Sequence, residues 1–327
     1  MPDGAAEIPS HDVASLDERV AAILGGQRRS LGVVRFRERF IYALLFGCGI
    51  FSLGITIAIV VVLATQTIRF FGFEEVTLSN FLFSTNWNPL LGGEKSFGIW
   101  ALVSCTLLVT VIAMVVALPS GLITAIYLSE YAPRWVRGIL KPILEILAGV
   151  PTVAYGFFAL TVITPVLMNL HGGFSVYNAL SGGIAVGILC LPTVCSLAED
   201  ALTAVPDSLR DGAYGLGGTR FDAAVKVIFP AALSGIISAA LLAVARAVGE
   251  TMIVAIACGQ QPQLTVDPRQ EIQTMTGFMT QMVSGDVSNE GIEYFSMYAV
   301  AFSLFLITLT ITTIGNLIRR RYREAYE

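Results

Sequence analysis

The chain has 327 residues, of which 55% are hydrophobic and only 13% charged, and its mean hydropathy is +0.73. This composition is far too apolar for a water-soluble domain of that length, and it indicates a membrane protein with several spans. The formal net charge of −4 says little about partners, because the placement of Lys and Arg matters more than their sum. We expect membrane lipid and no nucleic acid among the partners.

The cysteines and histidines point neither to disulfides nor to a metal site. None of the five cysteines has CxxC spacing, and all lie within or beside apolar runs. The only histidines are His11, in the N-terminal tail, and His171, in a predicted loop. The phosphate-binding motif GxxxxGK[ST] does not occur, so any ATP that drives this protein must be hydrolysed by another chain.

The N-terminal segment, residues 1–39, is predicted to be a cytoplasmic tail. Ser15 to Glu18 form a capping-box pattern before an apolar periodicity. We expect a short amphipathic helix there that ends near Gly25 and Gly26. Five arginines between residues 28 and 39 should stay in the cytoplasm.

Residues 40–318 are predicted to be the transmembrane domain. The uncharged run from Phe40 to Ile68 can cross a hydrocarbon core of about 30 Å with some tilt. A cleavable signal peptide has an apolar region of only about 7–15 residues, so this run is interpreted as a permanent span. Residues 71–95 then predict an external segment, and Ser96 to Ser129 a second span. The basic residues Arg134, Arg137 and Lys141 mark the return to the cytoplasm.

Ile146 to Ala198 contains no Asp, Glu, Lys or Arg and can hold two spans separated by the turn-rich stretch from Asn169 to Gly183. Glu199 and Asp200 follow, and we expect them to form a solvated helix end. Several residues of the third span could either unwind or bend it near a pathway, exposing backbone groups to an anion, or serve only for packing and a kink, and the sequence leaves both open; they are Gly149, Pro151, Tyr155 and Gly156.

Ala231 to Cys258 predicts a fifth span, rich in the small residues that let helices approach closely. The next segment, to Glu293, is predicted to be external, with an amphipathic helix from Gln270 to Val283 lying at the outer face. Tyr294 to Ile318 is the predicted sixth span, and residues 319–327 form a basic tail. Six spans place both termini on one side, and the distribution of Lys and Arg assigns that side to the cytoplasm.

A polar loop, residues 207–230, joins spans four and five. Pro206 and Asp207 suit a helix start, and Gly217 permits a sharp bend. A second short helix is expected from Thr219 to Phe229, ended by Pro230. An ordinary turn-forming loop is the competing interpretation.

Residues at fixed offsets in this loop favour a docking motif over an ordinary turn: Asp211, Ala213, Gly217, Val227, Phe229 and Pro230. Their spacing resembles the EAA loop of ATP-binding-cassette (ABC) importer permeases, written E-A-A-x3-G-x9-I-x-L-P. Asp211 stands in place of the Glu, and Gly212 in place of the first Ala. The resemblance implies that the loop docks into a groove of a nucleotide-binding subunit and transmits its motion.

Span five carries two charges, Arg246 and Glu250. Sixteen residues at about 1.5 Å each place Arg246 roughly 24 Å from Pro230, at or beyond the membrane midplane. A buried arginine costs at least about 2.5 kcal/mol, so it needs a partner or a use. Glu250, one helical turn away on the same face, is the expected partner. The pair is either a self-neutralising structural contact or an anion site, because guanidinium matches the oxygens of phosphate or sulfate.

Four stretches of the chain carry a second resemblance. ARAVGETM at 245–252 resembles the ARA-x-GET segment of the permeases of the Pst phosphate importer. Three more resemble its C-type permease, PstC: FLFSTNWNP at 81–89, AGVPTVAYGFFAL at 148–160 and LPTVCSLAEDAL at 191–202. The resemblance implies a bacterial inner-membrane complex with a homologous permease, PstA, and an external binding protein, PstS. A PstB ATPase dimer would hold ATP and Mg²⁺, so no cofactor is expected in this chain.

The sequence therefore predicts an all-α, six-span permease subunit of the type I ABC importer fold that imports inorganic phosphate by alternating access and performs no covalent chemistry. Arg246 and Glu250 are its predicted pathway residues. Sulfate or molybdate stays open as the substrate, since an arginine recognises charge and oxygens but not the central atom. A stand-alone secondary transporter also uses intramembrane charge, but the loop spacing opposes it.

Overall fold

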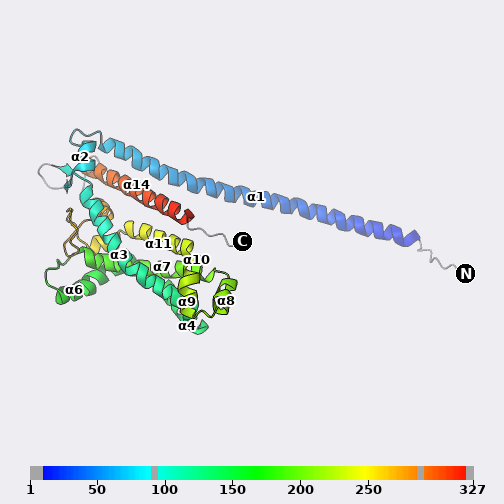
Figure 1. The fold of residues 1–327 in the computed structure, drawn as a ribbon. Helices are drawn as coiled ribbons and strands as arrows, with labels where there is room; N and C mark the ends of the chain where they lie inside the picture. Colours follow the sequence, from blue (N-terminus) through cyan, green and yellow to red (C-terminus); the bar gives the residue numbers. More distant parts are fainter. Residues whose placement is uncertain (1–9, 90–94, 286–290, 322–327) are drawn as a thin grey trace. The chain divides into compact units, whose positions relative to one another are not determined.

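The computed structural model describes residues 10–89, 95–285 and 291–321. The chain forms two units, Met1–Val62 and Leu63–Glu327. Apart from loops, the described residues are helical, with one small antiparallel sheet in which β1 (Trp87–Asn88) pairs with β2 (Ser96–Phe97) (Figure 1). The predicted all-α class is therefore confirmed.

A single helix, α1 (Ser10–Phe70), makes up the described part of the first unit and continues into the second. The expected short helix ending near Gly25 and Gly26 is wrong, because the backbone stays helical through both glycines. A glycine inside a helix costs only about 1 kcal/mol relative to alanine, which is too little to end a long helix. Residues 36–70 are apolar and long enough to span a membrane, as predicted for span one.

Five helical stretches within the described residues are long and apolar enough to cross a membrane: Phe36–Phe70, Trp100–Tyr131, Thr152–Leu170, Ala179–Thr203 and Ile292–Arg321. The second joins α3 (Trp100–Ile126) to a π-helical turn, η1 (Tyr127–Tyr131), and the third joins α5 (Thr152–Phe158), η2 (Ala159–Ile163) and α6 (Thr164–Leu170). The last two are α7 (Ala179–Thr203) and α14 (Ile292–Arg321). Between the second and third lies the shorter helix α4 (Arg134–Ala148).

The predicted fifth span is not one continuous helix. It consists of α11 (Leu233–Val248) and α12 (Met252–Ala257), separated by Gly249, Glu250 and Thr251. At 16 residues α11 is short for a span, and a sixth candidate is reached only by joining it to the preceding helical segment, Arg220–Ala231, across a bend of 70°. The expectation of an unbroken helix from Ala231 to Cys258 is therefore wrong.

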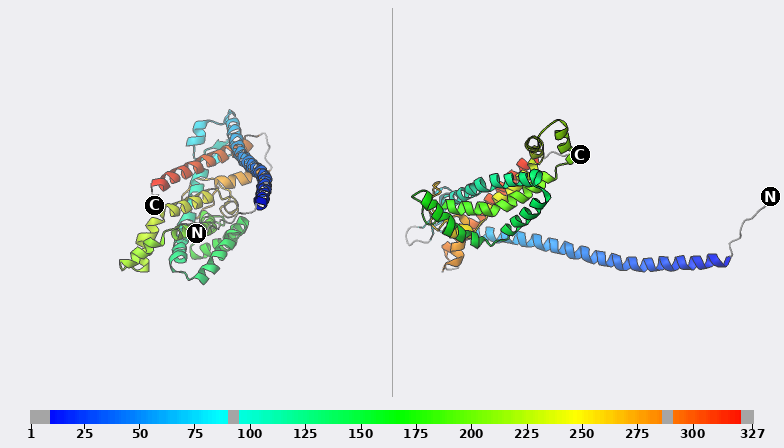
Figure 2. Two further views of the ribbon diagram at one scale, coloured as in Figure 1. Left: turned by 90° about the vertical axis from the view of Figure 1, so that its right-hand side faces the viewer. Right: turned by 90° about the horizontal axis from the view of Figure 1, so that it is seen from below.

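The pair α3 and α7 forms the centre of the second unit, with the most extensive contact of any two elements (Figures 1 and 2). Glycines allow the close approach: a Cβ on Gly183 would lie 2.6 Å from Ile112 Cγ2, and one on Gly187 would lie 2.9 Å from the Ala113 carbonyl oxygen. Small residues serve this purpose in membrane helices generally. Helix α11 packs against both α3 and α7.

A second apolar cluster gathers α2 (Leu78–Phe83), the small sheet and α13 (Met275–Ser284). Trp87 packs edge to face on Phe278, with ring centroids 5.0 Å apart. The helix expected from Gln270 at the outer face instead begins at Met275, where the Thr274 hydroxyl accepts a hydrogen bond from the Gly277 amide. Its apolar side, including Met275 and Phe278, is buried in this cluster, so the three- and four-residue periodicity marks a face packed on protein.

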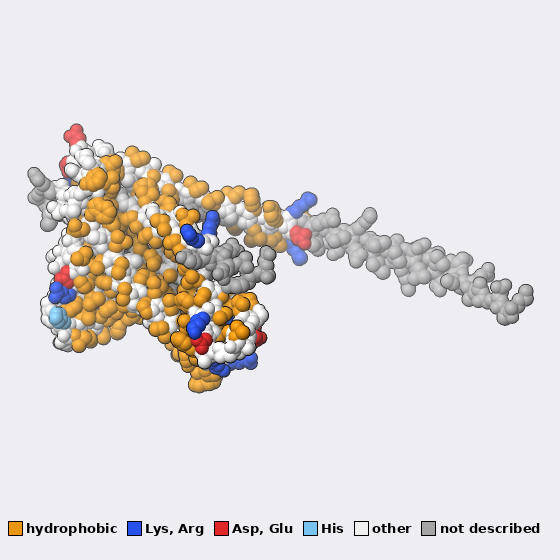
Figure 3. All heavy atoms as spheres, viewed as in Figure 1, with side chains coloured by type: hydrophobic (Ala, Val, Ile, Leu, Met, Phe, Trp, Pro, Cys, Tyr) orange, Lys and Arg blue, Asp and Glu red, His pale blue; other side chains and the backbone are white. Residues whose placement is uncertain are grey.

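Hydrophobic side chains cover much of the visible surface of the second unit (Figure 3). Examples are Val115 and Ile123 on α3 and Leu309 on α14, all exposed. Contiguous apolar surface on this scale belongs in hydrocarbon or against another apolar chain, which agrees with a membrane-spanning body.

Candidate functional site

The 207–230 loop folds as two short helical segments joined by a sharp bend. The first is α8 (Asp207–Gly215), which starts at the residue that the sequence predicts. Gly217 has φ +82°, a left-handed value that glycine adopts without strain, so the predicted bend is confirmed. The second segment runs through α9 (Arg220–Ala223), η3 (Ala224–Ile228) and α10 (Phe229–Ala231). This segment ends at Ala231, one residue after Pro230, instead of at Phe229 as predicted, and a bend of 70° separates it from α11.

The motif residues of this loop divide into an inward and an outward set. Ala213 and Phe229 are half-buried and pack against the cluster formed by the ends of α3 and α7. Asp211 and Gly217 are exposed. The tip of the loop presents large apolar side chains to solvent, with Leu216 92% and Phe221 64% exposed. The other motif residues are Val227, half-buried, and Pro230, exposed.

A capping box begins the second helical segment. The Thr219 hydroxyl accepts from the Asp222 amide, and the Asp222 carboxylate accepts from the Thr219 amide, each at 3.2 Å. Lys226 Nζ lies 2.6 Å from the same carboxylate. The ammonium of Lys226, followed by the Thr219 hydroxyl, lowers the pKa of Asp222 to about 2. Aspartate at this position also suits the positive end of the helix dipole.

Arg246 and Glu250 do not form the expected ion pair. Arg246, exposed in the last turn of α11, donates from Nη1 to the Thr193 hydroxyl of α7 at 3.3 Å. Glu250 is buried, and its Oε1 accepts from the amides of Met252 and Ile253, each at 3.2 Å. The helix ends at Val248, so a spacing of four residues no longer places the two side chains on one helical face. The carboxylate instead caps the first turn of α12.

Most of the N–H donors of Arg246 are therefore available to a ligand. Within the described chain its hydrogen-bond partner is one hydroxyl, and a guanidinium has five N–H donors in a planar fork. The Tyr155 hydroxyl of α5 donates to the Leu147 carbonyl at 2.8 Å. This cationic surface can hold an anion.

The small residues of the third span have structural roles. Gly149 and Pro151 lie at the break between α4 and α5. A Cβ on Gly156 would lie 3.0 Å from Ile256, so this glycine allows α5 to pack closely on α12. Of the two interpretations left open by the sequence, the structure shows packing and a kink at these positions, and a role beside a pathway stays a prediction.

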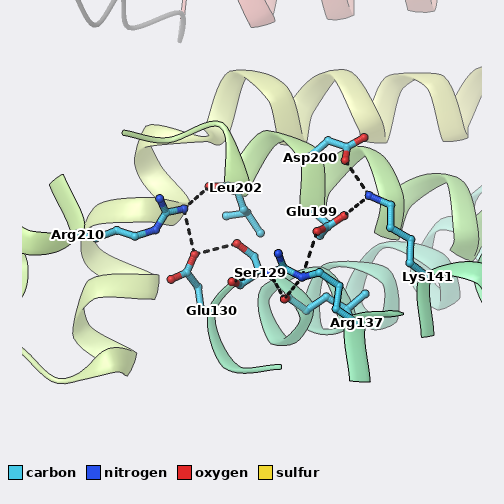
Figure 4. Close-up of polar contacts among 9 residues, drawn as sticks. Ser129, Glu130, Arg137, Lys141, Glu199, Asp200, Leu202 and Arg210 are labelled. Carbon is cyan, nitrogen blue, oxygen red and sulfur yellow. Dashed lines mark hydrogen bonds and ion pairs between the residues drawn. The ribbon is translucent and has the colours of Figure 1, made fainter. Parts of the chain in front are cut away.

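A buried ionic cluster at the ends of α3 and α7 was not predicted (Figure 4). Glu199, expected to be solvated, is buried and lies 2.8 Å from Lys141 and 3.7 Å from Arg137, both on α4. Asp200 is exposed, as expected, and also contacts Lys141. The hydrogen bond to Glu199 is the main reason that the pKa of Lys141 is raised. Pairing between residues almost 60 positions apart gives no local signal in a sequence.

Among the described residues, no group of three or more His, Cys, Asp or Glu side chains could hold a metal ion. The candidate site consists of two parts, Arg246 in α11 and the 207–230 loop.

Comparison with known proteins shows which family this chain resembles. The family model described as binding-protein-dependent transport system inner membrane component matches residues 117–324. The chain belongs to this family. The match contains both the 207–230 loop and Arg246, so both parts of the candidate site lie within the family domain of this multi-pass inner-membrane permease.

Individual relatives extend over most of the chain. The probable ABC transporter permease protein YqgH of Bacillus subtilis is 31% identical over 306 residues, 92% of this chain and 96% of that protein. The phosphate transport system permease proteins PstC of Mesorhizobium japonicum and Xylella fastidiosa are 30% and 29% identical, over 77% and 74% of this chain and 79% of each relative. These matches confirm the predicted family resemblance.

An inward-facing crystal structure of the MetNI methionine ABC transporter has a similar fold, with a TM-score of 0.53 at 19% identity. The similarity covers 69% of this chain and 95% of that one. It confirms the predicted type I ABC importer permease fold.

Proposed function

We propose that this permease imports inorganic phosphate as one of two membrane subunits of an ATP-driven complex. The observation that carries the proposal is Arg246, an intramembrane cation that lies on α11 without a carboxylate partner among the described residues. An unpaired charge is costly in a membrane unless a ligand uses it. Relatives named as phosphate permeases share most of the chain, which supports phosphate as that ligand.

Arg246 and its neighbours can recognise the oxygens of phosphate. The guanidinium offers a bidentate fork, and the Thr193 hydroxyl beside it can donate to a further oxygen. Glu250 holds the break between α11 and α12 by capping α12, which keeps Arg246 at the end of its helix. In this role Glu250 positions the site and does not neutralise the arginine.

The 207–230 loop is proposed to dock on an ATPase subunit. Its exposed apolar tip, Leu216 and Phe221, suits insertion into a groove of a partner, and Gly217 sets the angle between its two helical segments. By the resemblance, that partner is a PstB dimer that binds ATP and Mg²⁺, while PstA completes the pathway and PstS delivers phosphate from outside. The permease itself catalyses no reaction.

Transport by the reconstituted complex tests the substrate. Proteoliposomes holding the co-expressed complex and its binding protein should take up labelled phosphate only with ATP, and excess unlabelled sulfate or molybdate should leave that uptake unchanged. If either anion reduced phosphate uptake, that anion would be assigned as the substrate instead. Uptake by this chain alone, driven by an ion gradient and with no co-purifying ATPase, would replace the proposal with secondary transport.

A further inference from the structure

Arg210, on α8, joins the loop to two transmembrane helix ends at once (Figure 4). Its guanidinium donates to the carbonyl oxygens of Leu202 and Val205, at 2.8 and 2.7 Å, where α7 ends. The same group lies 3.4 Å from the Glu130 carboxylate of η1, at the end of α3, and 2.8 Å from the exposed carboxylate of Asp207 on α8 itself. The last carbonyls of a helix lack intrahelical partners, and a cation there is favoured by the helix dipole.

Arg137, on α4, makes the converse connection. It donates to the carbonyl oxygens of Leu128 and Ser129, where η1 ends, and lies 3.7 Å from the Glu199 carboxylate of α7. Each arginine thus takes carbonyl oxygens from one helix end and a carboxylate from the other. The two bridges cross between the same pair of helices.

The two glutamates and Arg210 are shielded from water, whereas the side chains of Arg137 and Lys141 are 35% and 37% exposed. The side chains of Glu130 and Glu199 are 6% and 5% exposed, and that of Arg210 is 16% exposed. Breaking a buried pair on one side leaves an uncompensated charge, which is much more costly than breaking an exposed one. The ends of α3 and α7 therefore cannot separate from each other, or from α8, without a large penalty.

Arg210 differs from Arg137 in the element that carries it. Arg137 belongs to α4, whereas Arg210 precedes the exposed Asp211 of the docking motif on α8. On α8, one residue faces the transmembrane helices and the next faces outward. A displacement of α8 by an attached subunit is therefore applied directly to the buried guanidinium.

We propose that Arg210 is the positioning residue through which movement of α8 is transferred to α3 and α7 together, with Glu130 and the carbonyls of Leu202 and Val205 as its contacts outside α8. This inference deepens the proposed function and rests on it for the source of the movement. The loop thus acts on both helices through the Arg210 side chain, while Arg137 and Glu199 keep the two helix ends together.

The ratio of phosphate imported to ATP hydrolysed tests this role in the complete complex. Arg210→Gln should lower the ratio about tenfold, a usual size for coupling between sites, while the ATPase still co-purifies and hydrolyses ATP. Arg210→Lys should be intermediate, because its three donors share one nitrogen and cannot match the planar fork whose Nη1 and Nη2 reach acceptors on both helix ends. The control is Arg269→Gln, which removes the same charge from an exposed pair with Asp267, outside the loop and the ionic cluster, and should keep the wild-type ratio.

A merely structural Arg210 would give a different result. Transport and ATP hydrolysis would then fall together with the amount of assembled complex, and their ratio would stay at the wild-type value. That outcome in Arg210→Gln, or in Arg210→Lys if the glutamine variant does not assemble, overturns the proposal.

Amide hydrogen exchange gives a second measurement that is independent of the substrate. In the wild-type complex, a non-hydrolysable ATP analogue should change exchange in α8 and at the ends of α3 and α7. In the Arg210 variants, the change should remain in α8 and disappear from α3 and α7; persistence at all three sites would refute the role of Arg210. If the wild-type complex shows no change in α8 itself, or imports no phosphate, the proposed function has failed instead.

Discussion

Within the described residues, the Arg246 guanidinium donates to one hydroxyl, that of Thr193. Most of its donors therefore remain for a ligand. The carboxylate of Glu250, four residues later, accepts hydrogen bonds from the backbone of α12. At the scale of single residues, the two charges therefore have separate roles, which makes their substitutions separable in experiment.

Arg246→Gln should abolish phosphate uptake while the complex still assembles, because the positive charge that attracts the anion is lost. Arg246→Lys should retain partial uptake, since a point charge keeps the attraction but loses the bidentate fork. Uptake of labelled phosphate and co-purification of the partner subunits measure the two effects. Arg269→Gln, which removes an exposed arginine charge outside the spans, is the control and should transport normally.

The double exchange Arg246→Glu with Glu250→Arg distinguishes this site from a structural pair. Because neither residue is the other's partner in the structure, the exchange should not restore uptake. An arginine at position 250 would also remove the cap of α12. Wild-type uptake by the double variant would contradict the anion site and reinstate a self-neutralising pair.

Asp222 gives a prediction about pH. The pKa of its carboxyl in the folded protein is about 2, below the ordinary value of about 3.9. The charged carboxylate therefore stabilises the capping box fully above the ordinary pKa, and this contribution is lost as the pH falls toward 2. Lys226→Gln removes the largest cause of the lowered pKa, so the titration midpoint of Asp222 should rise. Infrared spectroscopy of the isotope-labelled carboxyl measures this midpoint. An unchanged midpoint would contradict the assigned ion pair.

At the scale of elements, apolar runs locate the helices well, but not their breaks or their neighbours. The interruption at Gly249 to Thr251 lies inside an apolar run. The predicted pairing of Glu250 with Arg246 requires a continuous helix there. The burial of Glu199 depends on Arg137 and Lys141, which are distant in sequence. Such contacts follow from the packing of α4 on α7, and a pattern along one segment does not contain them.

The 207–230 loop was better predicted, because its signals are local. The start of α8 at Asp207 follows from Pro206, and the bend follows from a glycine with positive φ. The location of Arg246 in the last turn of α11 was not predictable, although its importance was, since a charge in an apolar span is rare whatever the helix does. The assignment of Arg246 and Glu250 to a substrate pathway stays a prediction.

Gly217→Ala tests the geometry of the loop. A Cβ there would meet nothing within 4 Å, so the substitution is unfavourable only because of φ +82°. Left-handed backbone costs a non-glycine residue about 1–2 kcal/mol, so attachment of the ATPase should weaken by roughly 5- to 30-fold. Gly217→Asp should act in the same direction, without loss of membrane insertion.

Gly212→Ala is the matched control for this substitution. Gly212 lies within α8 and also has open space around its Cβ, but it has an ordinary helical backbone. Its replacement should leave attachment unchanged or slightly strengthened, because alanine favours a helix. Equal binding of the ATPase by both variants in a pull-down titration would show that the bend at Gly217 is not needed for docking.

At the scale of the whole molecule, the second unit has two ends separated by apolar helices. One end carries the 207–230 loop and the ionic cluster around Arg210 and Glu199, and the other carries the small sheet and α13. The proposed function requires these ends to face opposite compartments, with the loop on the ATPase side. The orientation is a prediction from the distribution of Lys and Arg.

Single cysteines at the two ends test that orientation. Asn86, beside β1, and Ser284, at the end of α13, are exposed and should react with a membrane-impermeant maleimide in intact cells. Ser208, exposed on α8, should react only after permeabilisation, as should Tyr322, which lies outside the described residues. Cys48→Ser supplies the background, because the other four native cysteines are buried. Labelling of Ser208→Cys in intact cells, with protection of Asn86→Cys, would invert the topology. The 207–230 loop would then face away from ATP and could not couple its hydrolysis to transport.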